Sequence, residues 1–136
     1  MPLKAYSRVL RIIGSSVKRK IRNMNDILFR RFCKVQDSVN PPYDKSGWIF
    51  QDVRQKIICN DGFSFSCQAS GDHYCSPKEY GLPAKDYKTW EIGYPSAPDH
   101  ALIPFIEDDD RDSTDSVYPY VPTDVVLDLI DKHGGL

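Results

Sequence analysis

A tight turn followed by strict alternation constrains the fold of this chain more than any other feature. In IICNDGFSFSCQAS, residues 60–62 read Asn-Asp-Gly and separate two short apolar runs. These residue types favour the turn of a β-hairpin. Apolar side chains then alternate with polar ones, and the apolar positions are Phe63, Phe65, Cys67 and Ala69. The period of two predicts a hairpin over residues 57–70 with one buried face and one face in water.

Two later segments extend this sheet. In TWEIGYPS, the apolar residues Trp90, Ile92 and Tyr94 alternate with Glu91 and Gly93, so we expect the three to share one face of a strand. Pro95 ends that strand, because proline cannot donate to a ladder of hydrogen bonds. VYPYVP, residues 117–122, is a further extended segment limited by its prolines.

The chain ends in a segment with clear helical signals. In PTDVVLDLIDKHGG, Pro122 suits the first turn of a helix, and Gly134 suits the left-handed residue that follows one. The expected buried stripe is Val125, Val126, Leu129 and Ile130. We predict an α+β fold, in which a small antiparallel sheet has this C-terminal helix packed on it and is preceded by a basic amphipathic N-terminal helix.

Charge is distributed unevenly along the chain. The formal net charge is only −1, but residues 1–34 hold ten Lys or Arg and one acid, Asp26. The other 102 residues hold eight basic and eighteen acidic residues. We therefore predict a basic helical arm over residues 1–35, a linker over residues 36–47 and one domain over residues 48–136. The length leaves room for a single core.

The basic arm has apolar residues at intervals of three and four from Leu3 to Leu28, as a helix face requires. We expect this helix to break near Gly14, since glycine costs about 1 kcal/mol relative to alanine there. The arm could bind nucleic-acid phosphates, lie on an anionic membrane, or pack on the body or on a second copy of the chain. The nucleic-acid candidates are Arg8, Arg11, Lys18, Arg19, Lys20 and Arg22.

No apolar run approaches the roughly 20 residues that cross a bilayer, so no transmembrane segment is predicted. Four cysteines are too few for a disulfide-dense domain, which favours a reduced, cytoplasmic setting.

An acidic loop, EDDDRDSTDS, precedes the last extended segment. Its alternating aspartates resemble the start of a calcium loop, but Ser113 and Pro119 stand where that loop needs glycine and glutamate. No metal site is therefore predicted. The carboxylates could instead imitate a phosphate backbone and contact a protein surface. The partner-binding candidates are Glu107, Asp108, Asp109, Asp110, Asp112, Asp115, Asp128 and Asp131.

The segment CQASGDHYCSP raises the question of a chemical site. Its cysteines lack the paired CxxC spacing of a structural zinc site. His73 and Cys75 could act as base and nucleophile if a loop brings them together, but residues two apart in a strand lie about 6.5 to 7 Å apart. We predict no catalytic residue and no cofactor, and we keep His73 and Cys75 as a less favoured site.

Several phrases in order resemble a known group of proteins: CNDGFSFSCQAS, HYCSP, EIGYPS, an acidic stretch before VYPYVP, and a closing KHGGL. Together they resemble small, uncharacterised accessory proteins of bacteriophages and prophages, over about residues 57–136. The resemblance implies a protein that acts in the cytoplasm of a bacterial host, and it implies no known activity. Cys67 departs from the pattern, because an apolar residue such as valine is usual there.

Resemblance and charge together indicate a non-enzymatic phage accessory protein. We expect it to bind a host protein, such as a component of nucleic-acid-directed defence that it would inhibit, through its acidic surface. The alternative is a nucleic-acid-binding module that uses the N-terminal arm, and a small Cys/His enzyme is less favoured. A homo-oligomer stays open.

Overall fold

The computed structural model describes residues 15–38 and 54–136, with side chains from Asp26 onward. The described residues form two α-helices and four strands, as predicted for an α+β fold: α2 (Ser15–Asp37), β1 (Ile57–Ile58), β2 (Ser64–Gln68), β3 (Thr89–Gly93), β4 (Val117–Pro122) and α3 (Thr123–Lys132). Short 3-10 helices η1 (Ala84–Asp86), η2 (Ile103–Phe105) and η3 (Ser113–Asp115) lie in the connections. The break expected near Gly14 lies outside the described residues.

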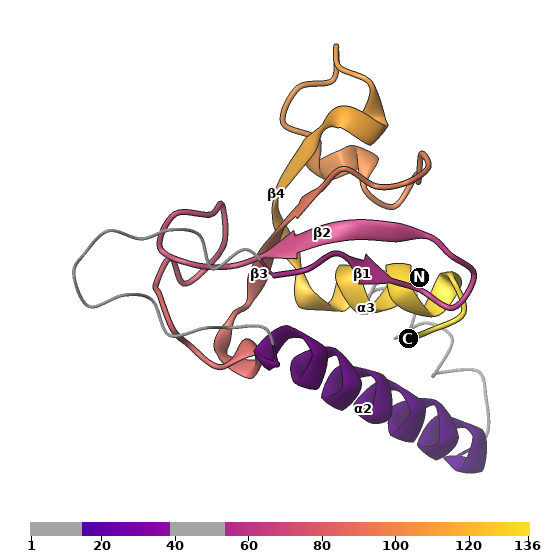
Figure 1. Ribbon diagram of the computed structural model, residues 1–136. Helices are drawn as coiled ribbons and strands as arrows, with labels where there is room; N and C mark the ends of the chain where they lie inside the picture. The colour runs from indigo at the N-terminus through magenta and orange to yellow at the C-terminus, as the bar shows by residue number, and fades with distance from the viewer. Residues whose placement is uncertain (1–14, 39–53) are drawn as a thin grey trace.

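The strands form one antiparallel sheet in the order β1-β2-β3-β4, so each strand pairs with its neighbour in sequence. Cys67 lies opposite Ile92 between β2 and β3, and Trp90 lies opposite Val121 between β3 and β4. Both α2 and α3 lie on the same side of this sheet, and the connection between β3 and β4 extends beyond it (Figure 1). The opposite side, which we call the outer face, has no helix of the described residues on it.

The predicted hairpin is present. Its turn contains Gly62 at φ +92°, and the Asp61 carboxylate accepts a hydrogen bond of 2.8 Å from the Phe63 amide. All four predicted apolar positions of the second strand are buried: Phe63, Phe65, Cys67 and Ala69. The other face is less wet than predicted, because Gln68 and Ser70 are also buried. Gln68 bonds to the backbone of Arg54 and Ser70 bonds to His73, so each polar group has a partner.

Trp90 is fully buried at the centre of the core. Its ring meets the Phe32 ring of α2 edge to face, with centroids 5.1 Å apart, and its indole N–H donates to Thr123 Oγ1 at the start of α3 over 3.0 Å. Trp90 therefore contacts both helices from the sheet. Edge-to-face aromatic pairs add to the free energy gained by burial alone.

The predicted boundary between arm and body is wrong. Helix α2 runs to Asp37, inside the segment predicted as a linker, and its residues Phe32 and Gln36 are buried in the core of the body. The second half of α2 is thus part of the same packed unit. Sequence periodicity showed an apolar face on this helix but not the surface that covers it.

A buried arginine joins α2 to the sheet. The Arg54 guanidinium donates to the carbonyl oxygens of Gln36 at 3.1 Å and Ala69 at 2.7 Å, and lies 5.4 Å from the Trp90 ring centroid. The Gln68 side chain both accepts from the Arg54 amide and donates to its carbonyl, each over 2.7 Å. A buried charge is costly without such partners, so these bonds define where α2 ends against β2.

Tyr94 departs from the predicted alternation. It was expected to share a buried face with Trp90 and Ile92, but its side chain is 47% exposed and its φ is +50°. A left-handed residue at the end of a strand turns the chain and redirects its side chain, which periodicity does not show. In α3 the predicted stripe is buried at Val126, Leu129 and Ile130, and Val125 is half-buried.

The last turn of α3 is clamped to the hairpin through His133. Its Nδ1 lies 2.6 Å from the Asp61 carboxylate and its Nε2 lies 2.9 Å from that of Asp99, so both nitrogens face acceptors. The imidazole also stacks on the Phe63 ring, with centroids 3.8 Å apart. Lys132 adds an ion pair of 2.5 Å to the buried Asp99. Two carboxylate partners require a doubly protonated imidazolium.

These contacts shift the pKa values of both His133 and Asp99. Burial by itself would lower the pKa of His133, but the hydrogen bonds to Asp99 and Asp61 outweigh it and raise that pKa. Burial would raise the pKa of Asp99, but the bonds from Lys132, His133 and the Ala101 amide lower it. The clamp is therefore complete only while His133 holds its second proton.

Replacing His133 with glutamine should lower the free energy of unfolding by about 1 to 3 kcal/mol at pH 6, because a buried charged hydrogen bond to Asp99 is lost. The folded-state pKa of His133 lies above its ordinary value of 6.5. Its contribution is therefore fully present below that value and is lost as pH rises through the folded-state pKa. Urea denaturation from pH 5 to 9 should show a steeper fall for the native chain than for His133→Gln. The exposed His100→Gln is the control, and equal slopes for all three chains would contradict the clamp.

Candidate functional site

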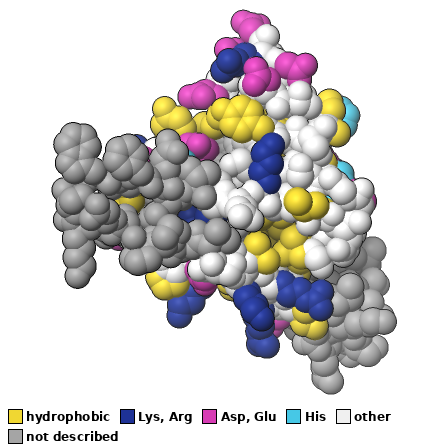
Figure 2. Space-filling model, viewed as in Figure 1, with side chains coloured by type: hydrophobic (Ala, Val, Ile, Leu, Met, Phe, Trp, Pro, Cys, Tyr) yellow, Lys and Arg dark blue, Asp and Glu magenta, His cyan; other side chains and the backbone are white. Residues whose placement is uncertain are grey.

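The structure gathers most of the predicted acidic residues at one end of the molecule. We call residues 107–116, between η2 and β4, the acidic end. Acidic side chains cluster on this projecting end, and basic ones lie at the opposite edge, over α2 (Figure 2). The separation of charge along the sequence is therefore also a separation in space.

Local hydrogen bonds hold the acidic end in a defined shape. The Glu107 amide donates to the Val117 carbonyl over 3.0 Å and closes the loop at its base. The Asp112 carboxylate accepts from both the amide and the hydroxyl of Thr114, at 2.8 and 2.7 Å, and so caps η3. These bonds lower the pKa of Asp112, so it stays ionised at neutral pH. The acidic side chains of this loop are exposed, but several of its backbone amides are hydrogen-bonded.

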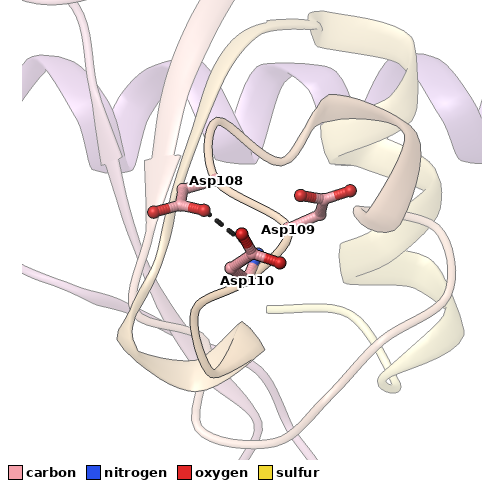
Figure 3. A group of neighbouring side chains, drawn as sticks. All are labelled: Asp108, Asp109 and Asp110. Carbon is pink, nitrogen blue, oxygen red and sulfur yellow. Dashed lines mark hydrogen bonds between the residues drawn. The ribbon is translucent and has the colours of Figure 1, made fainter.

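Three consecutive aspartates form the densest part of the acidic end. One carboxylate oxygen from each of Asp108, Asp109 and Asp110 lies within 4.8 Å of the others, and all three side chains are exposed. The Asp110 amide donates to Asp108 Oδ1 over 3.0 Å, so the chain turns between these two residues (Figure 3). Three carboxylate oxygens could ligate a divalent cation. A calcium site, however, uses about six to eight oxygen ligands, which is more than this group offers.

Arg111 is the one basic residue of the acidic end. Arg111 lies 4.0 Å from Asp115, and both side chains are largely exposed, so the pair contributes little to stability. The remaining acidic side chains predicted here, from Glu107 to Asp115, are all exposed. Like charges held close together repel, and the fold leaves that repulsion largely uncompensated.

The two predicted partner-binding candidates on α3 differ in solvent exposure. Asp131 is exposed, but Asp128 is only 8% exposed and belongs to the buried side of the helix. Burial raises the pKa of Asp128 to about 6, and the nearby charges of Asp124 and Asp131 raise it too. Asp128 is therefore corrected from a surface candidate to a buried residue.

His73 and Cys75 do not form a nucleophile and base pair. His73 Nδ1 lies 2.6 Å from Ser70 Oγ, and the Cys75 thiol donates to the Ser70 carbonyl over 3.2 Å. Burial lowers the pKa of His73 and raises that of Cys75, which favours a neutral imidazole and a protonated thiol. Both side chains hold the loop after β2 through Ser70. The structural role that the sequence favoured for Cys67 also fits, since that side chain is fully buried beside Phe65.

Cys75 should therefore react slowly with thiol reagents in the folded protein. We expect iodoacetamide at pH 7 to modify Cys33, which is half-buried, before it modifies Cys59, Cys67 or Cys75. Peptide mapping by mass spectrometry measures the order, and a urea-unfolded sample is the control for intrinsic reactivity. Fast modification of Cys75 in the folded protein would contradict this prediction and support Cys75 as a nucleophile.

A basic stripe lies on the exposed side of α2. Arg30, Arg31 and Lys34 are exposed, and so are Ile27 and Val35, which occupy the same side at helical spacing. Of the predicted nucleic-acid residues, Arg8 and Arg11 lie outside the described residues. Helix α2 contains the other four, Lys18, Arg19, Lys20 and Arg22. The stripe extends the predicted set toward the C-terminal end of the helix.

A groove of about 410 Å³ lies where α2, η1 and α3 meet. Its lining combines apolar and charged residues: Asp26, Phe29, Lys85, Tyr87, Lys88, Pro122, Thr123, Asp124 and Leu127. Both acidic and basic side chains line this groove, so its charge does not favour an anionic or a cationic ligand.

Sequence reasoning missed Arg54 and the exposed tyrosines of the outer face. Nothing in the local pattern around Arg54 distinguishes it from a surface cation. Tyr74 and Tyr120 lie 46 residues apart, so only the fold brings their rings together.

No protein-family model, curated protein or solved structure matches this chain. None of the helices in the part of the chain that the structure describes is long and apolar enough to cross a membrane.

Proposed function

We propose that this chain is a non-enzymatic accessory protein of a bacteriophage or prophage that binds a host protein through its acidic end. The observation that carries the proposal is the dense group of exposed carboxylates at residues 107–115, with Arg111 as the cation among them. A basic partner surface would relieve their mutual repulsion, and complementary charge speeds association. The resemblance of several sequence phrases to phage accessory proteins supports an interaction inside a bacterial host.

The expected partner has a surface that is itself basic, such as a nucleic-acid-binding component of host defence. A carboxylate array in a loop of defined shape presents negative charge at fixed positions, as a phosphate backbone does. A protein of this kind would inhibit its target by occupying the surface that binds nucleic acid. Asp128 and Asp131 of α3 lie outside the acidic end, and Asp128 is also buried, so neither belongs to this proposal.

Changing Asp108, Asp109 and Asp110 together to asparagine should weaken capture of the host partner by about tenfold or more, since several exposed charge contacts of 0.2 to 1 kcal/mol each would be lost. The measurement is affinity purification from nuclease-treated host lysate, followed by titration of the recovered protein. The matched control neutralises three exposed acids elsewhere, Asp72, Glu79 and Asp86. Equal loss in both variants, or none in the first, would contradict a role for the acidic end.

A second candidate function is binding of nucleic acid through α2. It is favoured by Arg30, Arg31 and Lys34, which are exposed on one side of the helix. Basic side chains gather over α2, away from the acidic end (Figure 2). Phosphate contacts by such residues need no sequence specificity.

If α2 binds nucleic acid, glutamine at Arg30, Arg31 and Lys34 should weaken binding of a DNA duplex. It should also reduce the slope of log affinity against log salt by about 0.9 per lost contact. Fluorescence anisotropy from 50 to 300 mM salt measures both quantities. The control changes the exposed cations Lys56, Lys85 and Arg111 instead. An unchanged slope in the α2 variant would exclude this use of the helix.

A further inference from the structure

The outer face of the sheet carries a pair of tyrosines whose position depends on the backbone. Trp90 and Ile92 of β3 face the helices, so Glu91 between them faces outward. The Glu91 carboxylate accepts a hydrogen bond of 2.8 Å from the Tyr74 amide. The Tyr74 carbonyl accepts one of 3.1 Å from the Tyr120 amide of β4. The Tyr74 backbone thus bridges β3 and β4 on the outer face.

The two rings lie together and remain open to solvent. Their centroids are 6.1 Å apart at an angle of 53°, and Tyr74 and Tyr120 are 42% and 49% exposed. Tyr120 lies where the pairing of β3 and β4 is irregular and has a φ of +54°. A bulge of this kind redirects the side chain that it carries. Two large rings that contact each other could have packed into the core, and the fold instead presents them outward.

The surroundings of the pair select a cationic ligand. The Glu91 carboxylate lies next to the Tyr74 backbone, and the acidic end stops one residue before β4 begins. Tyr120 is four residues beyond Ser116, about 13 Å along the strand at about 3.3 Å per residue. An apolar patch lies just beneath the acidic end (Figure 2). The Lys78 ammonium lies 5.7 Å from the Tyr74 ring centroid, so one of these rings already holds a cation.

We propose that Tyr74 and Tyr120 form an arginine-binding surface for a segment of the partner protein, whose other basic residues contact the acidic end. This inference rests on the proposed function, since it specifies the partner of the same acidic end. A guanidinium is flat, so it can stack on a tyrosine ring while it donates to a carboxylate such as Glu91. It would replace the exposed Lys78 ammonium, which is more strongly hydrated and stacks less well.

Other occupants fit the surface less well. A strand of nucleic acid could stack bases on the tyrosines, but its phosphates would meet Glu91 and the carboxylates of the acidic end. A purely apolar segment would leave Glu91 without a charged partner. An arginine-rich segment satisfies the rings and the carboxylates together.

The test compares two peptides of equal charge, nona-arginine and nona-lysine, by isothermal titration against the full chain. The native protein should prefer nona-arginine. In Tyr74→Leu/Tyr120→Asn that preference should fall by about two- to fivefold, which is the effect of one exposed cation–π contact. Asparagine is chosen at Tyr120 because it tolerates a positive φ. The control is Tyr94→Asn, another exposed tyrosine with positive φ, and it should keep the preference. Circular dichroism confirms folding, and Glu91→Gln gives a second variant that leaves both rings in place.

The outcomes separate this proposal from the proposed function. An unchanged preference in the tyrosine variant and in Glu91→Gln overturns the arginine-binding surface alone. If neutralising Asp108, Asp109 and Asp110 leaves the affinity for both peptides unchanged, the acidic end is not the binding surface and both proposals fail. Tyrosine-dependent binding of a twenty-residue oligothymidylate in place of the peptides would identify a nucleic-acid site and overturn the proposal.

Discussion

The buried guanidinium of Arg54 is the interaction on which the arrangement of helix and sheet depends. Taking a cation out of water costs several kcal/mol unless hydrogen bonds replace its hydration. Here the replacements come from the last turn of α2, from the residue after β2 and from the Trp90 ring, so the charge is accommodated only when these parts meet. The side chain of Gln36 adds a bond of 2.8 Å to the Cys67 carbonyl at the same junction. The polar junction therefore specifies one position for α2.

That position commits one face of the sheet to the helices, and no helix of residues 15–38 or 54–136 covers the outer face. Phe32, Trp90 and Leu129 fill the space between the sheet and the helices. The outer face and the connection between β3 and β4 carry the exposed tyrosines and the carboxylates. Packing the second half of α2 on the opposite side also keeps its basic stripe away from the acidic end (Figure 2). The packing of both helices on one face of the sheet thus produces both the exposed tyrosine pair and the separation of charge.

Much of the fold followed from local patterns, and the errors have identifiable causes. Turn residues, alternation and helix-capping signals act over a few residues, and they predicted the hairpin, β3 and α3. Tyr94 broke its alternation because a left-handed backbone ended the strand. Asp128 was expected at the surface because its charge was read without its neighbours on the helix, and its carboxyl is instead buried. The predicted boundary after residue 35 failed because Phe32 and Gln36 belong to the core.

By itself, the sequence determined the hairpin, β3, the C-terminal helix, the α+β class and the presence of one basic and one acidic region. These properties depend on residue type and on spacing over at most a few turns. Only the tertiary structure decided that Arg54 is buried, that His133 lies between Asp61 and Asp99, and that Tyr74 meets Tyr120. Each of these contacts joins residues far apart in the chain, and its free energy exists only after packing has brought the partners together and removed water from between them.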